Sequence, residues 1–483
     1  MRVLQIGAGP TGVSLFIQLY SQLAKQDPVL EYVIADGLKP GAGLAFGTHY
    51  NSHIINLPAS IMSLNPENPL EFVEWRAKNQ SLWQAASLEE NQAWSEFPQR
   101  RLFGIYVEHQ LQNALNNAPY AELINTAVTC VTPIKSVKKF TVEFENGTEE
   151  IFDKVIVCIG HAPKSPLLSS TSKKLLRSPY QGLKIPADAT VGIIGSRLTA
   201  IDAVLALQEK GHTGKIFMVS RAGKLPKVIA EHSGYDAEAF IAALLDEKTQ
   251  TLESILAIHK KELDKVTNHL IDWNALLHAG PTKAEELEQE LHNCSEGNHL
   301  WQSVLLASYT VVDKLWSKLS DDDKATFMTR YYGPWMTYLA AFPAFSATRI
   351  LQLMKAEQLH IFSDLQGIEA TESSFEIYHG QSECLCVEYL IDGRGAGYDE
   401  ADLKELPVLK NMLVNGTIST HPLGGVSINP LTYQALSRRG DEVPGLFFVG
   451  DMTKGEFLAT TDVVRSVMHG VAATSAILSR TLT

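Results

Sequence analysis

The first 36 residues constrain the fold of this chain more than any other stretch. Residues 2–6 read as a short buried strand, residues 7–12 as a tight turn with the pattern G-x-G-x-x-G, and residues 13–23 as a helix with one apolar face. A second strand at residues 32–35 ends on Asp36. This order of strand, glycine turn, helix, strand and acid is typical of a dinucleotide-binding βαβ unit. We therefore predict an α/β protein that begins with such a unit.

The glycines of the turn have separate roles in such a unit. Gly7 makes the sharp turn, Gly9 lets backbone N–H groups approach a pyrophosphate, and Gly12 lets the helix lie close to the strand. The helix N-terminus faces the anion, and the acid accepts hydrogen bonds from the adenosine ribose. The turn alone does not separate FAD from NAD, and a purely structural glycine turn is the alternative. The candidate cofactor residues are Gly7, Gly9, Pro10, Thr11, Gly12 and Asp36.

The charge balance argues against several classes of partner. The 483 residues contain 41 Lys and Arg against 54 Asp and Glu, which gives a net charge of −13. There is no basic run, so we expect no nucleic-acid partner. No stretch approaches the roughly 18 apolar residues of a membrane helix. Because the nucleotide unit begins at residue 2, we also expect no signal peptide, no membrane partner and a cytoplasmic protein.

The cysteines and histidines form no recognisable metal or dithiol motif. The five cysteines include no C-x-x-C pair, which disfavours a flavin disulfide reductase of that type. The histidines between residues 229 and 341 are scattered without metal-ligand spacing, so solvated helix histidines are the simpler interpretation. We expect no metal, and a homo-oligomer is left open.

Two loops after the first unit carry polar residues suited to a flavin site. A glycine-rich loop at residues 37–47 leads to His53 and Asn56, and a later segment places Arg100 and Arg101 at the start of a predicted helix. His53 and Asn56 either line a flavin ring or reflect ordinary turn chemistry. The two arginines are either surface charge or a clamp for an anion.

A second nucleotide unit follows a group of short strands at residues 123–159. The last of these strands ends on Gly160, and the new unit begins with a strand at 190–194. A glycine turn, a helix at 201–210 and a strand at 216–219 follow, but this strand ends on Ser-Arg instead of an acid. Arginine there accommodates the 2′-phosphate of NADP, with a solvated strand end as the alternative. The candidate residues for this cofactor are Gly195, Ser196, Arg197, Ser220 and Arg221.

The remaining chain divides into a helical part and a return to strands. Residues of about 229–341 are helical by periodicity and rich in Glu and Lys, which indicates a helical insertion. Near the C-terminus, a buried strand stops on Gly450 and Asp451, where a carboxylate can lie near a flavin ribityl chain. We expect an FAD-binding part at 1–165, an NADP-binding domain with the insertion at 186–360, and a second FAD-binding part at 361–483.

Four blocks together resemble a known family. Residues 7–12, 41–58, 195–221 and 447–451 resemble the FAD/NAD(P)-binding flavoproteins with two dinucleotide-binding domains, allied to class B flavin monooxygenases and amine N-hydroxylases. The resemblance implies two Rossmann-like domains, one for FAD and one for NADPH. It implies FAD at Gly7, Gly9, Gly12, Asp36, Gly160, Gly450 and Asp451. It implies NADPH at Gly195, Ser196, Ser220 and Arg221.

The second turn departs from the family pattern at one position. Arg197 occupies the slot of the second glycine. Its side chain either obstructs close backbone approach to a pyrophosphate or binds the phosphates through its guanidinium.

The function implied by the resemblance is that of an FAD enzyme. It would take hydride from NADPH, capture O₂ as a flavin hydroperoxide and pass one oxygen atom to a small nucleophilic substrate such as an amine. Because the flavin supplies the chemistry, no Ser-His-Asp triad is needed. A flavin dehydrogenase or oxidase without oxygen transfer, and a non-catalytic flavoprotein that holds a partner, are the alternatives. The candidates for the oxygen and substrate site are His53, Asn56, Arg100 and Arg101.

Overall fold

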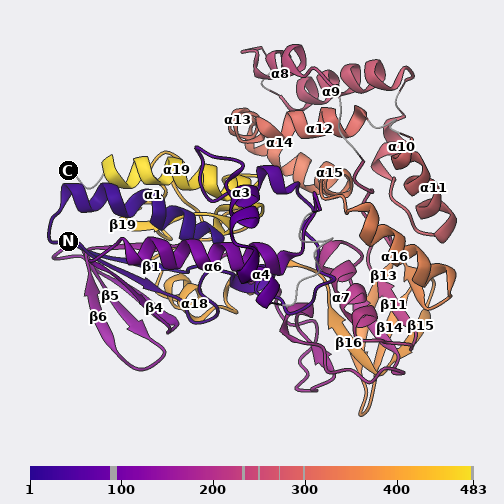
Figure 1. The fold of residues 1–483 in the computed structure, drawn as a ribbon, viewed down its shortest axis with the longest axis horizontal. Coiled ribbons are helices and arrows are strands. Elements are labelled where there is room, and N and C mark those ends of the chain that lie inside the picture. Colours follow the sequence, from indigo (N-terminus) through magenta and orange to yellow (C-terminus); the bar gives the residue numbers. More distant parts are fainter. Residues whose placement is uncertain (87–94, 231–233, 249–250, 271, 297–299, 480–483) are drawn as a thin grey trace. The chain divides into compact units, whose positions relative to one another are not determined.

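The chain folds into two compact units. The computed structural model describes residues 1–483 except 87–94, 231–233, 249–250, 271, 297–299 and 480–483. Unit 1 comprises residues 1–51, 57–165 and 396–483, and unit 2 comprises residues 52–56 and 166–395. Each unit contains a mainly parallel sheet with helices, so the predicted α/β class with two nucleotide-type domains is confirmed (Figure 1).

Unit 1 is organised around a six-stranded sheet. Five of its strands are parallel, and one edge strand is antiparallel. The predicted first strand and second strand are both present and pair with each other, Ile6 opposite Ala35. In spatial order the strands are β18 (Gln434–Leu436), β19 (Glu442–Phe448), β7 (Lys154–Val157), β1 (Arg2–Ile6), β2 (Glu31–Ala35) and β3 (Ala121–Ile124).

Apolar helix faces cover this sheet. Helix α1 (Pro10–Gln26) begins with a proline in its first turn, and its buried residues include Val13, Leu19 and Leu23. It packs against α19 (Val463–Ser479), which lies beside it in Figure 1 although it comes from the other end of the chain. The other elements of unit 1 are α2 (Gly43–Phe46), α3 (Glu71–Lys78), α4 (Gln80–Ala85), α6 (Arg100–Asn116), β4 (Val128–Ile134), β5 (Lys139–Phe144), β6 (Glu149–Phe152), α17 (Glu400–Leu403) and α18 (Pro407–Val414).

Unit 2 has a five-stranded parallel sheet with the second glycine turn at its centre. Helix α7 (Leu198–Glu209) follows that turn. The strands in spatial order are β12 (Leu359–Phe362), β11 (Ile216–Val219), β10 (Val191–Ile194), β16 (Tyr389–Asp392) and β9 (Leu175–Leu176). A separate antiparallel sheet consists of β13 (Leu365–Ala370), β14 (Phe375–His379) and β15 (Glu383–Val387).

The segment predicted as an insertion, about 229–341, is helical in the part that the structure describes. It lies in the sequence between β11 and β12, and α16 then leads back to the sheet. The helices are α8 (Glu238–Leu245), α9 (Leu252–Thr267), α10 (Trp273–Leu277), α11 (Ala284–Ser295), α12 (Leu300–Thr310), α13 (Val312–Lys318), α14 (Asp321–Thr326), α15 (Tyr332–Leu339) and α16 (Ala344–Lys355).

The boundary of the C-terminal part differs from the expected residue 361. Unit 1 resumes only at Ala396, because the strands between 359 and 392 belong to unit 2. β12 pairs with β11, and β16 pairs with β10, so both complete the second sheet. The apolar stretch from Cys384 to Ile391 is divided between two strands, β15 and β16, which belong to different sheets. Pairing partners far apart in sequence decide this boundary, and local periodicity does not reveal them.

Asp402 links two segments of unit 1, the one that ends at Ser165 and the one that begins at Ala396. β8 (Ala162–Pro163) pairs there with β17 (Ala396–Gly397). The buried Asp402 carboxylate accepts hydrogen bonds from Lys164 Nζ at 2.8 Å and from the backbone N–H of Ser165 at 2.7 Å. Burial alone would raise the pKa of Asp402, but these donors outweigh it and lower the pKa to about 2.

We predict that Asp402 makes unit 1 more stable above pH 4 than below it. Because the folded-state pKa is depressed, this stabilisation is fully present above the ordinary pKa of 3.8 and is lost as the pH falls toward 2. Asp402→Asn should lower the free energy of unfolding by about 2 kcal/mol at neutral pH and flatten its acid dependence. Denaturant unfolding between pH 2 and 7 measures this. The exposed Asp441→Asn is the control, and equal pH profiles for the two variants would contradict the assignment.

Candidate functional site

The first glycine turn has two packing glycines and one that faces open space. A Cβ on Gly7, whose φ is +101°, would lie 2.5 Å from the carbonyl oxygen of Cys158, and one on Gly12 would lie 2.3 Å from the carbonyl oxygen of Gly7. A Cβ on Gly9 would meet no described atom within 4 Å, and its φ of −72° suits any residue. Gly9 also provides no side-chain cap for α1, so the first N–H groups of the helix are left for another acceptor. The open position at Gly9 leaves room for a pyrophosphate, and pyrophosphate binding at this turn stays a prediction.

Asp36 lies beside this turn at the end of β2. Its Oδ2 accepts a hydrogen bond from the N–H of Ala8 at 2.8 Å, and its Oδ1 accepts one from the N–H of Leu38 at 2.8 Å. The side chain is partly exposed. The predicted acid is therefore in register with the turn, and its hydrogen bond to a ribose stays a prediction.

The structure brings the other two predicted FAD segments to the same edge of the sheet. β1 and β19 both pair with β7, with Ile6 and Phe448 each opposite Val157. Gly160 follows β7 with φ of +69°, and a Cβ there would meet no described atom within 4 Å. Gly450 follows β19, and a Cβ there would lie 2.8 Å from Cγ2 of Thr11 in the first turn. The carboxyl ends of three strands thus form one cradle, where ligands of parallel sheets bind.

Asp451 is a buried carboxylate at this edge. Tyr398 donates its hydroxyl to Oδ1 and Oδ2 at 3.1 Å each, and Thr460 donates to Oδ1 at 2.8 Å. Nδ1 of His161 lies 3.5 Å from Oδ2. Burial would raise the pKa of Asp451, but His161, Thr460 and the charge of Lys454 outweigh it, so the pKa is lowered.

Sequence reasoning missed three of these residues. His161 had a local signal, because it directly follows Gly160. Tyr398 and Thr460 had none, since only the fold brings them to Asp451.

The second turn brings the two predicted serines together. A Cβ on Gly195, whose φ is +129°, would lie 2.5 Å from the carbonyl oxygen of Gly393, so this glycine is required for packing. Ser196 Oγ lies 2.9 Å from Ser220 Oγ and donates to the carbonyl oxygen of Lys224 at 2.7 Å. Ser220 Oγ also accepts from the N–H of Gly223 at 2.9 Å. The ends of β10 and β11 thus present a small hydroxyl cluster.

Arg197, the departure from the fingerprint, is held by the helical segment. Its Nη2 donates to the carbonyl oxygen of Gly333 at 2.6 Å and to Oγ1 of Thr337 at 3.0 Å, both in α15. Its buried Nη1 has no hydrogen-bond partner among the described residues. Burial lowers the pKa of Arg197, and the positive charge of Arg221 lowers it further. An unpartnered guanidinium nitrogen near a second, exposed arginine fits an anion such as a dinucleotide phosphate.

The four predicted oxygen- and substrate-site residues belong to different units. His53 and Asn56 lie in the 52–56 segment of unit 2, whereas Arg100 and Arg101 form the first turn of α6 in unit 1. His53 is fully buried, with Nε2 3.0 Å from the carbonyl oxygen of Asp202. The members of each pair therefore belong to the same unit, and the two pairs belong to different units. Their catalytic roles stay predictions.

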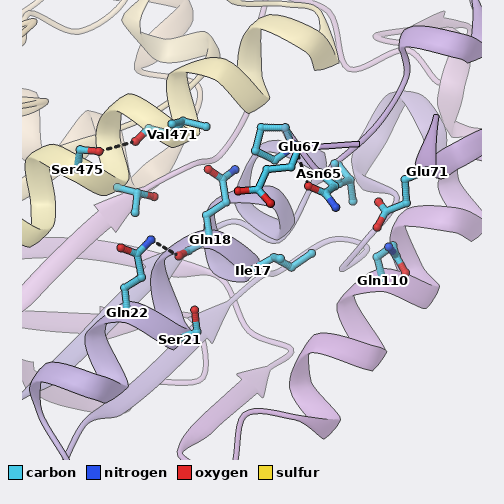
Figure 2. A pocket seen from close by; sticks show the side chains of 13 residues that line it. Ile17, Gln18, Ser21, Gln22, Asn65, Glu67, Glu71, Gln110, Val471 and Ser475 are labelled. Carbon is cyan, nitrogen blue, oxygen red and sulfur yellow. Dashed lines mark hydrogen bonds between the residues drawn. The ribbon is translucent and has the colours of Figure 1, made fainter. Parts of the chain in front are cut away.

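A cavity of about 470 Å³ lies in unit 1 and is lined by both polar and apolar side chains (Figure 2). It lies along the C-terminal half of α1, where Ile17 is seven residues, or roughly 10 Å, beyond Pro10. It is therefore separate from the glycine turn. The lining residues are Ile17, Gln18, Ser21, Gln22, Leu64, Asn65, Pro66, Glu67, Glu71, Gln110, Val471, Thr474 and Ser475.

Neither a metal-ligand group nor a membrane-spanning helix occurs among the residues that the structure describes. They contain no group of three or more His, Cys, Asp or Glu placed to hold a metal ion. Within the same described part of the chain, no helix is both long and apolar enough to cross a membrane.

Comparisons with known proteins agree with the first cradle and with the fold. An FAD-NAD(P)-binding family model matches residues 5–162. No curated protein sequence matches the chain significantly.

Solved structures match nearly the whole chain at low identity. The ornithine hydroxylase from Pseudomonas aeruginosa matches with a TM-score of 0.58 at 13% identity, and the match covers 99% of each chain. The ornithine N-hydroxylase from Kutzneria sp. 744 gives a TM-score of 0.59 at 13% identity with the same coverage. The bacillithiol disulfide reductase from Staphylococcus aureus gives 0.54 at 13% identity and covers 99% of this chain and 98% of that one. At this identity the likeness shows the fold.

We predict that Gly9→Val folds but loses FAD. The new side chain would meet no described atom of the protein, yet it would occupy the space that a pyrophosphate needs. Flavin absorbance of the purified variant should be absent while its thermal unfolding matches that of the apoprotein. Gly367→Val is the matched control, because that glycine in β13 also faces open space, and this variant should stay yellow. Full flavin content in Gly9→Val would contradict the assignment.

The family match and the geometry of the first cradle lead to the same conclusion. Residues 5–162 supply the glycine turn, the acid beside it and the open position at Gly160, which are the parts of a dinucleotide site. Residues 5–162 thus match an FAD-NAD(P)-binding family model, and the chain as a whole has the fold of the solved ornithine hydroxylases.

Proposed function

We propose that this protein is an FAD-dependent monooxygenase that consumes NADPH and O₂ and transfers one oxygen atom to a small nucleophile, such as an amine. The observation that carries the proposal is the pair of glycine turns, one in each unit, with an open anion cradle at Gly9 and an unpartnered guanidinium nitrogen at Arg197. The hydroxylase structures with the same fold support oxygen transfer as the reaction class.

The proposed reaction is balanced. Substrate, NADPH, O₂ and one proton give oxygenated substrate, NADP⁺ and water. Bound FAD would supply the redox chemistry. The chain's own residues would bind the first dinucleotide at the α1 N-terminus, bind NADPH at the second turn, and move the proton that the reaction takes up.

NADPH is the proposed reductant because cationic groups and hydroxyls follow the ends of β10 and β11. Ser196 and Ser220 form a hydroxyl pair there, and Arg221 is exposed beside them. Arg197 adds a guanidinium nitrogen without a described partner. A phosphate on the ribose would meet these donors, whereas a free ribose would use few of them.

A second candidate function is a flavin reductase or oxidase without oxygen transfer. The fold likeness to a bacillithiol disulfide reductase favours it. A non-catalytic flavoprotein that holds a partner through the helical segment is the third. Rapid anaerobic bleaching of the flavin by NADPH would contradict the non-catalytic reading, and product analysis separates the first two.

We predict that Arg221→Ala weakens NADPH binding and spares NADH. A charge-assisted hydrogen bond is worth about 1.5–3 kcal/mol, which corresponds to a roughly ten- to hundred-fold loss for NADPH. Titration of the flavoprotein with each nucleotide measures this. The exposed Lys261→Ala on α9 is the control and should bind both nucleotides normally. Equal losses for NADPH and NADH would return Arg221 to a structural role.

We predict that ¹⁸O₂ labels the product. With amines and amino acids as test substrates, NADPH and O₂ should be consumed in equal amounts, and the product mass should increase by one labelled oxygen atom. Little hydrogen peroxide should be released. Unlabelled product with one hydrogen peroxide per NADPH would move the protein to the oxidase class.

A further inference from the structure

We propose that His161 and Asp451 form a proton-exchanging dyad at the flavin edge of unit 1, which takes up a proton from solvent when the flavin is reduced. Asp451 is the positioning residue and His161 is the group that holds the proton. The inference rests on the proposed flavin function. It adds a residue, His161, that the sequence motifs did not single out, and a role in proton transfer for Asp451.

The dyad is placed by two strands that end at the same edge. His161 follows Gly160 after β7, and Asp451 follows Gly450 after β19, with β7 and β19 paired in parallel. Both preceding residues are glycines with positive φ, which lets the chain turn sharply at the cradle. The side chain of His161 is 33% exposed and that of Asp451 is 8% exposed. The imidazole thus lies between a buried carboxylate and the open space beside Gly160.

The surroundings of Asp451 fix its orientation. Tyr398 contacts both carboxylate oxygens and Thr460 contacts one, so the carboxylate cannot rotate freely. Lys454 is also buried, and its Nζ lies 5.9 Å from the centre of the Tyr398 ring. Lys454 and Tyr398 are thus two titratable groups that act on the carboxylate of the dyad. With Nδ1 of His161 directed at Oδ2, Nε2 is the ring nitrogen that can exchange a proton with solvent or ligand.

A reduced flavin gives this arrangement a function. Bound FAD would accept two electrons and one proton as hydride from NADPH, and would thereby gain one unit of negative charge. A nearby imidazole that takes up a proton from solvent neutralises that charge, and the same proton is then available for the water molecule that the proposed reaction releases. By linkage, the charge on the flavin and the proton on His161 must stabilise each other equally.

The test is an equilibrium measurement that needs no substrate and no O₂. The FAD-loaded protein is reduced anaerobically in unbuffered solution, and proton uptake is followed with an indicator dye from pH 5 to 8. Wild type should take up more protons than His161→Gln, with an excess of up to about one proton per FAD within this pH range. Asp451→Asn should reduce this excess. His292→Gln, an exposed histidine of α11, should match wild type.

Equal proton uptake in wild type and His161→Gln at every pH would overturn the proposal. If His161→Gln fails to hold FAD, free FAD is the reference instead, because its reduced ring takes up protons by itself. Wild type must then take up more protons per flavin than free FAD, and equal uptake at every pH would overturn the dyad. Because no oxygen is involved, this outcome is independent of the labelled-oxygen experiment. A working dyad without product labelling would reject oxygen transfer and leave the dyad standing.

Discussion

The structure of unit 1 depends on the close approach of two backbone segments in its first glycine turn, at Gly7 and at Gly12. A Cβ on Gly12 would lie 2.3 Å from the carbonyl oxygen of Gly7, so α1 can reach its position over β1 only without that atom. The contact of Gly450 with Thr11 then brings the C-terminal strand to the same turn. Gly9 is different, because neither its backbone conformation nor its neighbours require glycine. An open position of this kind is explained by a ligand more simply than by the fold.

The buried carboxylate of Asp451 is the second feature on which the carboxyl edge of the unit 1 sheet depends. Isolated carboxylates are costly to bury, and Asp451 is stabilised by two hydroxyl donors, an imidazole and the charge of a buried lysine. Asp402, near the return of the chain to unit 1, is stabilised in the same way, with an ammonium and backbone N–H groups as donors. In both cases the donors come from segments far apart in the chain, so the carboxylates also fix which segments meet.

Unit 2 uses an arginine where the fingerprint has a glycine. The fold resolves the apparent conflict, since Arg197 donates to Gly333 and Thr337 of α15 in the helical segment. The segment therefore has a direct connection to the turn that is proposed to bind NADPH. This connection gives the insertion a structural role in the nucleotide site.

The sequence by itself determined the local units: both glycine turns, the strands and helices beside them, and the acid after β2. These depend on periodicity and on backbone requirements that a few adjacent residues express. Only the tertiary structure decided the return of the chain at Ala396, because strand pairing between β16 and β10 is not visible in a local pattern. It also assigned His53, which is fully buried, to unit 2 and Arg100 to unit 1. His161 and Asp451 lie 290 positions apart in the sequence and meet because their strands pair with one another in parallel.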